Sequence, residues 1–173
     1  ENTNVRIETM EIFQTSLILA TFLCSLVAGF LFAYAIVVMP GIKSLSDRDF
    51  IRAFQVTDRV IQNNQPLFVI VWVGSAITLI ASAIWGIQRL DGLDLVLIAI
   101  ATLAYLLGVQ LSTIVIHLPL NNKLQTFDVD AMHETELELA RSNFEPRWNA
   151  SNLFRTSISS CVSVLLIILL FRL

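Results

Sequence analysis

Residues 67–117 read LFVIVWVGSAITLIASAIWGIQ, RLDG and LDLVLIAIATLAYLLGVQLSTIVIH, which are two long apolar runs joined by a tight polar turn. Each run reaches the roughly 20 apolar residues that a helix needs to cross a hydrocarbon core about 30 Å thick. A membrane span must satisfy its own backbone hydrogen bonds, and a barrel would show shorter, alternating segments. Residues 67–88 and 93–117 are therefore predicted to form a transmembrane helical hairpin.

Two further apolar runs, residues 13–39 and 149–171, have the same length and character. The whole chain is 55% hydrophobic and only 14% charged, with a mean hydropathy of +0.73, whereas soluble domains average about 25% charged residues. The sequence thus predicts an all-α, multi-pass integral membrane protein in the lipid bilayer. We expect a four-helix transmembrane domain over residues 13–173, preceded by an N-terminal extension over residues 1–12.

The connection after the first span is predicted to form an amphipathic helix at the membrane interface. Ser46, with Asp49 three residues later, resembles a helix-capping box. Apolar and wetter positions then alternate with helical spacing. The apolar side is expected to carry Phe50, Ala53, Phe54, Thr57 and Ile61. The wetter side is expected to carry Asp47, Arg48, Arg52, Gln55 and Arg59.

The connection after the third span contains an acidic segment, residues 128–141. Its charges follow one another without an evident apolar face, so a solvated helix capped by Asp128 or Asp130 is expected. Glu145 and Pro146 have the pattern of a helix start, with the proline at the first helical position. The fourth helix is therefore predicted to begin near Arg147.

The positive charges are distributed unequally between the two sides of this topology. The two long connections carry Lys43, Arg48, Arg52, Arg59, Lys123, Arg141 and Arg147, and the other side carries Arg6, Arg89 and Arg172. The positive-inside bias predicts that the long connections are cytoplasmic. The formal charge of −3 and the absence of a basic stripe argue against a nucleic-acid partner.

Polar side chains gather where the third span ends and the fourth begins. Amide and charged groups are costly in hydrocarbon, so they are candidates for a functional site. Both segments reach the same membrane face, which predicts a polar mouth over an apolar cavity. The candidate ligand-binding residues are Gln110, Asn121, Asn122, Arg147, Trp148, Asn149 and Asn152, and the candidate catalytic residues are His117 and Arg155. Arg155 is expected to bond amide oxygens near Asn121 or Asn122. The alternative is that these polar groups only hold the helices together.

Familiar catalytic signatures are not found in the sequence: a glycine-rich phosphate loop, a paired-cysteine metal site or a nucleophile elbow. His133 lies among glutamates and is expected to face water. We therefore expect no metal, flavin or other cofactor, although haem ligation by one histidine stays open.

Four motifs occur in order along most of the chain. They are VMPG at residues 38–41, Phe50-x-x-Ala-Phe-Gln55, His117-x-Pro-x-Asn-x-x-Leu124, and Arg147-Trp-Asn-x-x-Asn-x-x-Arg-Thr156. Together they resemble the anthrone oxygenase-like integral membrane family of small four-helix proteins. The resemblance implies an oxygenase that converts an anthrone to an anthraquinone with dioxygen, without a metal or flavin motif. The matching positions are His117, Pro119, Asn121 or Asn122, Leu124, Arg147, Trp148, Asn149, Asn152 and Arg155.

On this interpretation a flat phenolic substrate would partition from the bilayer and stack on phenylalanines, Tyr34 or Trp148. His117 could take a proton, and Arg155 with the asparagines could hold the resulting oxyanion. A different class of function stays open: a non-enzymatic lipid or quinone binder, or a subunit of a larger membrane complex. Transport ranks third, because four spans without inverted repeats offer little machinery for alternating access unless the chain forms a homo-oligomer.

Overall fold

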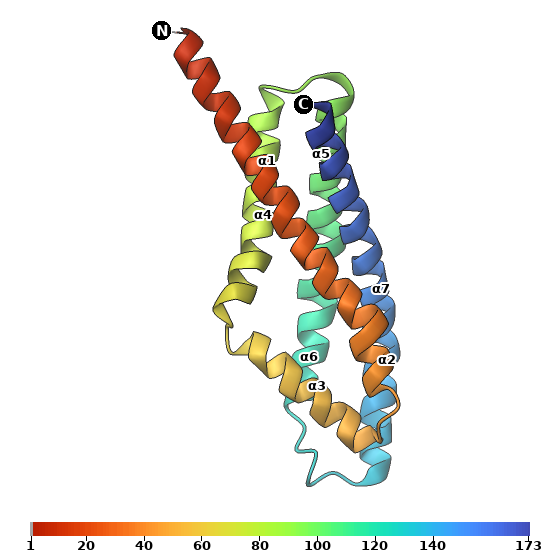
Figure 1. Cartoon of the computed structure of the whole chain (residues 1–173). Coiled ribbons are helices and arrows are strands. Elements are labelled where there is room, and N and C mark those ends of the chain that lie inside the picture. Colours follow the sequence, from red (N-terminus) through yellow and green to blue (C-terminus); the bar gives the residue numbers. More distant parts are fainter. Residues whose placement is uncertain (1) are drawn as a thin grey trace.

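The computed structural model of the chain describes residues 2–173, and the side chains of residues 10–173. Every element within these residues is helical (Figure 1). The elements are α1 (Asn2–Ala33), the π-helical η1 (Tyr34–Val38), α2 (Met39–Ile42), α3 (Asp47–Gln62), α4 (Pro66–Ile87), α5 (Gly92–Ala104), the π-helical η2 (Tyr105–Leu111) and η3 (Thr113–His117), α6 (Leu118–Gln125) and α7 (Glu134–Arg172).

Four helical stretches are long and apolar enough to cross a membrane. They are Met10–Ile42, Pro66–Ile87, Gly92–Gln125 and Glu134–Arg172. The predicted all-α transmembrane bundle is therefore confirmed, and the chain is a multi-pass integral membrane protein. Its four spans contain the predicted apolar runs, except that α4 ends one residue earlier, at Ile87.

Both ends of the chain and the α4–α5 turn lie at one end of the bundle, and α3 with the α6–α7 connection lies at the other (Figure 1). The latter is called the α3 end below. Helix α1 crosses the bundle diagonally and packs against α4 and α7, while α5 packs against α7. The two long connections thus lie together, as the alternation of four spans requires.

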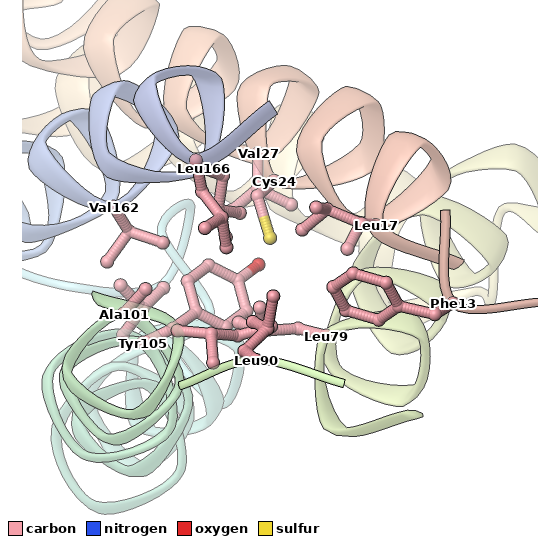
Figure 2. Packing of buried hydrophobic residues seen from close by; sticks show 14 of the residues in the cluster. Phe13, Leu17, Cys24, Val27, Leu79, Leu90, Ala101, Tyr105, Val162 and Leu166 are labelled. Carbon is pink, nitrogen blue, oxygen red and sulfur yellow. The ribbon is translucent and has the colours of Figure 1, made fainter. Parts of the chain in front are cut away.

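The half of the bundle away from α3 is closed by an apolar core. Figure 2 shows Leu17 and Val27 of α1, Leu79 of α4 and Leu166 of α7 gathered around the ring of Tyr105. The Tyr105 hydroxyl lies 2.7 Å from the Ser75 hydroxyl, so its polar atom is satisfied within the core. The buried side chains of this half therefore pack around Tyr105.

A second apolar cluster anchors α3 to the start of α7. Phe50 and Phe54 of α3 meet Leu137 and Phe144 of α7, all of them buried. The expectation that residues 128–141 lack an apolar face was therefore wrong. Leu137, with Ala140 and Phe144 at spacings of three and four, forms the stripe that packs on α3.

The predicted start of the fourth helix was also wrong. Helix α7 begins at Glu134, capped by His133 in a capping box with Glu136, and continues for 39 residues through Pro146. A proline inside a helix removes one backbone hydrogen bond and is normally unfavourable. Here the burial of Phe144 and Trp148 on either side of it holds both turns in place.

Helix α3 begins at Asp47 after the predicted cap, because the Ser46 hydroxyl accepts a hydrogen bond from the Asp49 amide. Gln55, expected on the wetter side, is only 6% exposed. Its amide donates to the backbone oxygens of Leu124 at 2.8 Å and Phe127 at 3.0 Å. The expectation failed because α6 and the following loop cover this second side of α3.

Two arginines of α3 form hydrogen bonds and ion pairs with the α6–α7 connection and the start of α7. Arg48 donates to the Met132 backbone oxygen at 3.0 Å and to Glu134 at 2.9 Å, and Arg52 pairs with Asp130. The position of α3 across the end of the bundle is thus fixed by both apolar and charged contacts.

Candidate functional site

A cavity of about 440 Å³ lies between the helices at the α3 end of the bundle. Its walls come from α1, η1, α3, α4, the η2–α6 stretch and α7. Its volume lies within the roughly 300–1,000 Å³ typical of small-molecule sites. The predicted residues that line it are Gln110, His117, Asn121, Trp148, Asn152 and Arg155.

Several cavity side chains project from π-helical turns. Tyr34 lies in η1, Gln110 in η2, and Thr113 and His117 in η3. Such turns are rare and occur often at functional sites. The regular helical spacing used to read the sequence does not hold through these segments.

Arg155 is the cation of the cavity wall and is 4% exposed. Its Nη1 donates to the Thr113 hydroxyl at 2.8 Å and its Nη2 to the Asn152 side-chain oxygen at 3.0 Å. Its Nε is buried without a hydrogen-bond partner among the described residues. The expected bonds to Asn121 or Asn122 are not formed, because those side chains lie about two helical turns closer to the α3 end.

The side-chain oxygen of Asn152 accepts a hydrogen bond from Arg155. Its Nδ2 donates to the Leu31 backbone oxygen at 3.2 Å, which orients its Oδ1 toward the guanidinium. Among the described residues Arg155 forms no ion pair. A buried guanidinium held only by neutral oxygens keeps a positive charge available to a ligand.

His117 is buried beside Trp148, with the two ring centroids 5.1 Å apart and the planes nearly perpendicular. Its Nε2 lies 2.9 Å from the Ser151 hydroxyl. Its Nδ1 is buried and has no hydrogen-bond partner among the described residues. One ring nitrogen is thus fixed by α7, and the other is left to accept or donate a proton.

Asp58 is a cavity residue that the sequence interpretation missed. It lies on α3, is 4% exposed, and lines the cavity. Its oxygens accept hydrogen bonds from Asn121 at 2.8 Å, Gln62 at 2.6 Å and Gln125 at 3.1 Å. The available signal was its spacing of four residues from Phe54, which places both on one helix face.

The Asp58 network extends to α7 through Asn121. The Asn121 side-chain oxygen accepts a hydrogen bond of 3.0 Å from the Trp148 indole nitrogen. The carboxylate on α3 therefore fixes the orientation of an amide on α6, which in turn fixes an aromatic wall of the cavity.

Aromatic rings line the cavity between these polar groups. Phe68 stacks on Trp72 with a centroid distance of 5.4 Å, and Phe30 contacts both Phe68 and Tyr34. Tyr34 lies 5.7 Å from Trp148, measured between ring centroids. The rings form a wall suited to a flat apolar molecule.

The rim of the cavity has a polar part and an apolar part. Gln62 and Asn64 are polar and exposed at the α3–α4 corner. Ile114 and Leu118 are apolar cavity residues that are 58% and 45% exposed on the membrane-spanning stretch. The cavity therefore borders both the polar interface and the lipid-facing surface.

Three predicted site residues lie outside this cavity. Asn122 and Arg147 are exposed, and Asn149 is half-buried on α7. Arg147 lines a separate surface hollow together with Lys123. These residues lie near the α3 end of the bundle, but their side chains do not line the cavity.

A family model described as anthrone oxygenase matches residues 54–165 of the chain. The matched segment contains Asp58, His117 and Arg155, and extends from the second half of α3 into α7. The comparisons with curated proteins and with solved structures found no match.

Proposed function

Because the chain belongs to the anthrone oxygenase family, we propose that it binds a flat, hydrophobic phenolic compound of the anthrone class and oxidises it with dioxygen without a metal or flavin. The partner is a small molecule dissolved in the bilayer, which reaches the cavity past Ile114 and Leu118.

One observation carries this proposal: a single cavity combines an aromatic wall with two buried side chains, Arg155 and His117, each of which leaves one nitrogen without a hydrogen-bond partner among the described residues. Leaving a buried donor unpaired costs about 1–3 kcal/mol. A ligand oxygen beside Arg155 would satisfy Nε, and an acidic C–H or O–H beside His117 would satisfy Nδ1.

In the proposed first step, His117 Nδ1 removes a proton from the methylene carbon of the anthrone. This requires that the ring hydrogen of His117 is on Nε2, which then donates a hydrogen bond to the Ser151 hydroxyl. The 2.9 Å contact allows this geometry. The negative charge moves onto the carbonyl oxygen, where the Arg155 N–H groups stabilise it. General-base catalysis of this kind contributes about 10²–10⁴-fold in rate.

The electron-rich enolate then reacts with dioxygen at the carbon that lost the proton, and the resulting peroxide anion takes the proton back from His117. The hydroperoxide formed there loses its second C–H hydrogen and breaks its O–O bond. One oxygen atom stays on carbon as the new quinone carbonyl, and the other leaves as water. The protein contributes deprotonation, orientation and exclusion of bulk water.

Substituting His117 by Asn tests the role of the imidazole. With the protein in nanodiscs, a hydroxylated anthrone should be consumed with matching dioxygen uptake and quinone absorbance, above the spontaneous rate. His117→Asn should lower this rate by about 100-fold or more while ligand affinity changes little. His133→Asn is the matched control, because His133 is an exposed cap residue of α7.

An unchanged rate in His117→Asn would remove the imidazole from the mechanism. Ligand binding without any dioxygen uptake in the wild-type protein would instead favour the non-enzymatic alternative, a quinone or lipid binder.

We further infer that the α3 end faces the cytoplasm. The connections at this end carry most of the Lys and Arg residues outside the spans, and such residues are retained on the cytoplasmic side.

A further inference from the structure

We propose that Asp58 selects the ligand by accepting a hydrogen bond from a ring hydroxyl, at the end of the cavity opposite Arg155. The preferred ligand would then be a fused aromatic compound with an acceptor oxygen at one end and a hydroxyl donor at the other. This inference rests on the function proposed above.

The position of Asp58 is built into the fold. Phe54, one turn before it, is buried against Phe144 and Trp148 of α7. Gln55 donates to the backbone oxygens of Leu124 in α6 and of Phe127 just after it. The carboxylate is therefore held at the cavity wall by its own helix. It does not depend on a flexible loop.

The carboxylate retains capacity for one more donor. A carboxylate has about four acceptor positions, and three amide hydrogens occupy them here. Two of these, from Gln62 and Gln125, reach Oδ2, while Oδ1 accepts a hydrogen bond from Asn121 and from no other described residue. Oδ1 is thus the atom that can bind a ligand hydroxyl.

The Asp58 and Arg155 ends are separated by about the length of a fused three-ring system. Asp58 is linked through Asn121 to Trp148, and Arg155 follows Trp148 by seven residues on α7. At 1.5 Å per residue this is about 10 Å along the helix. On the facing wall, Arg155 bonds Thr113 at the start of η3, whereas Asp58 bonds Asn121 in α6, so the two contacts lie at opposite ends of this stretch.

The charges at the two ends differ, and the rings between them are apolar. Arg155 offers N–H donors to a carbonyl or phenolate oxygen, and Asp58 offers an acceptor to a hydroxyl. A ligand bound the other way round would place its carbonyl oxygen against the carboxylate. The cavity therefore recognises both the chemistry and the direction of the ligand.

The alternative role for Asp58 is to tie α3 to α6 without contacting a ligand. A purely structural carboxylate would not discriminate between two ligands of nearly the same shape. The test accordingly compares an anthraquinone bearing one hydroxyl on an outer ring with the methyl ether of the same compound. Both are stable towards dioxygen, and the pH is set so that the phenol is protonated.

Wild-type protein in nanodiscs should bind the hydroxyl compound about tenfold or more tightly than its methyl ether, which corresponds to about 1.4 kcal/mol. Asp58→Asn should reduce this ratio to near one while still binding the ether. Asp94→Asn is the matched control, since Asp94 pairs with Arg172 at the far end of the bundle.

Equal affinities for the two compounds in wild-type protein would overturn the inference while leaving the cavity as a ligand site. The wild-type comparison needs no variant, so a failure of Asp58→Asn to fold does not remove the test. Failure of both compounds to bind would overturn this inference and the proposed function together.

Discussion

At the scale of single residues, Arg155 is the side chain on which the proposed function depends most. It is buried, forms no ion pair among the described residues, and leaves its Nε unpaired. Burying a charge without a carboxylate partner is unfavourable, so Arg155 is not expected to stabilise the folded protein. The proposed ligand, which uses the positive charge, would account for its presence.

Arg155→Leu should therefore leave the protein equally or more stable. The lost hydrogen bonds to Thr113 and Asn152 are offset by the removal of an incompletely satisfied guanidinium. Thermal unfolding in detergent micelles should give a Tm at or above the wild-type value. A Tm lower by about 10 °C or more would show that Arg155 is part of the structural framework.

The sequence could predict Arg155 and His117 because charged and imidazole groups inside apolar runs are conspicuous. Asp58 was missed despite its helical spacing from Phe54, because a carboxylate on an amphipathic helix normally faces water. Only the position of α6 shows that this face of α3 is covered. Arg147 was misplaced because nearness to the membrane face does not determine which side of a helix faces the cavity.

At the scale of elements, the close approach of η2 and α7 sets the width of the bundle beside the cavity. A Cβ atom on Gly108 would lie 2.9 Å from Cγ2 of Ile158, closer than side chains tolerate. Ile158 is β-branched, so it has little freedom to move aside. The glycine is required by this contact.

Gly108→Ala should destabilise the protein by about 1–3 kcal/mol. Because Ile158→Ala removes the clashing atoms, the double variant should be more stable than the sum of the single effects predicts. Gly29→Ala is the control, since a Cβ there meets nothing within 4 Å. Additive effects in unfolding measurements would contradict the close packing.

The start of α7 shows where local sequence signals fail. Glu145 followed by Pro146 has the pattern of a helix start, and the acidic segment before it resembles a separate solvated helix. The buried contacts of Leu137 and Phe144 with α3 outweigh that pattern, so the helix continues through the proline. Such tertiary contacts cannot be read from the segment alone.

At the scale of the whole molecule, the four spans were predictable because the bilayer imposes their length and composition. The arrangement of the termini and the long connections then follows from alternation of the spans. An apolar cavity with a polar mouth was predicted at the face where the helix ends meet, but the phenylalanines that line it were not identified. Its aromatic wall also requires α1 and α4, whose phenylalanines resemble ordinary lipid-facing residues in the sequence.

The orientation can be checked by cysteine accessibility. In a background without Cys24 and Cys161, Ser44→Cys should be protected from an impermeant thiol reagent in intact cells. Asp91→Cys, in the α4–α5 turn, should be labelled. The opposite pattern would reverse the proposed sidedness, and labelling of both from one side would contradict the four-span topology.

The proposed function requires that the cavity binds a flat aromatic ligand through Arg155. Tryptophan-fluorescence titration with an anthrone under anaerobic conditions tests it directly, because Trp72 and Trp148 line the cavity. Arg155→Lys keeps the charge but loses the planar donor fork, and it should weaken binding by about tenfold, a loss of about 1.4 kcal/mol. Arg155→Leu should weaken binding further, whereas Arg172→Lys should have no effect. Equal affinity in wild type and both Arg155 variants, at matched Tm, would contradict the account.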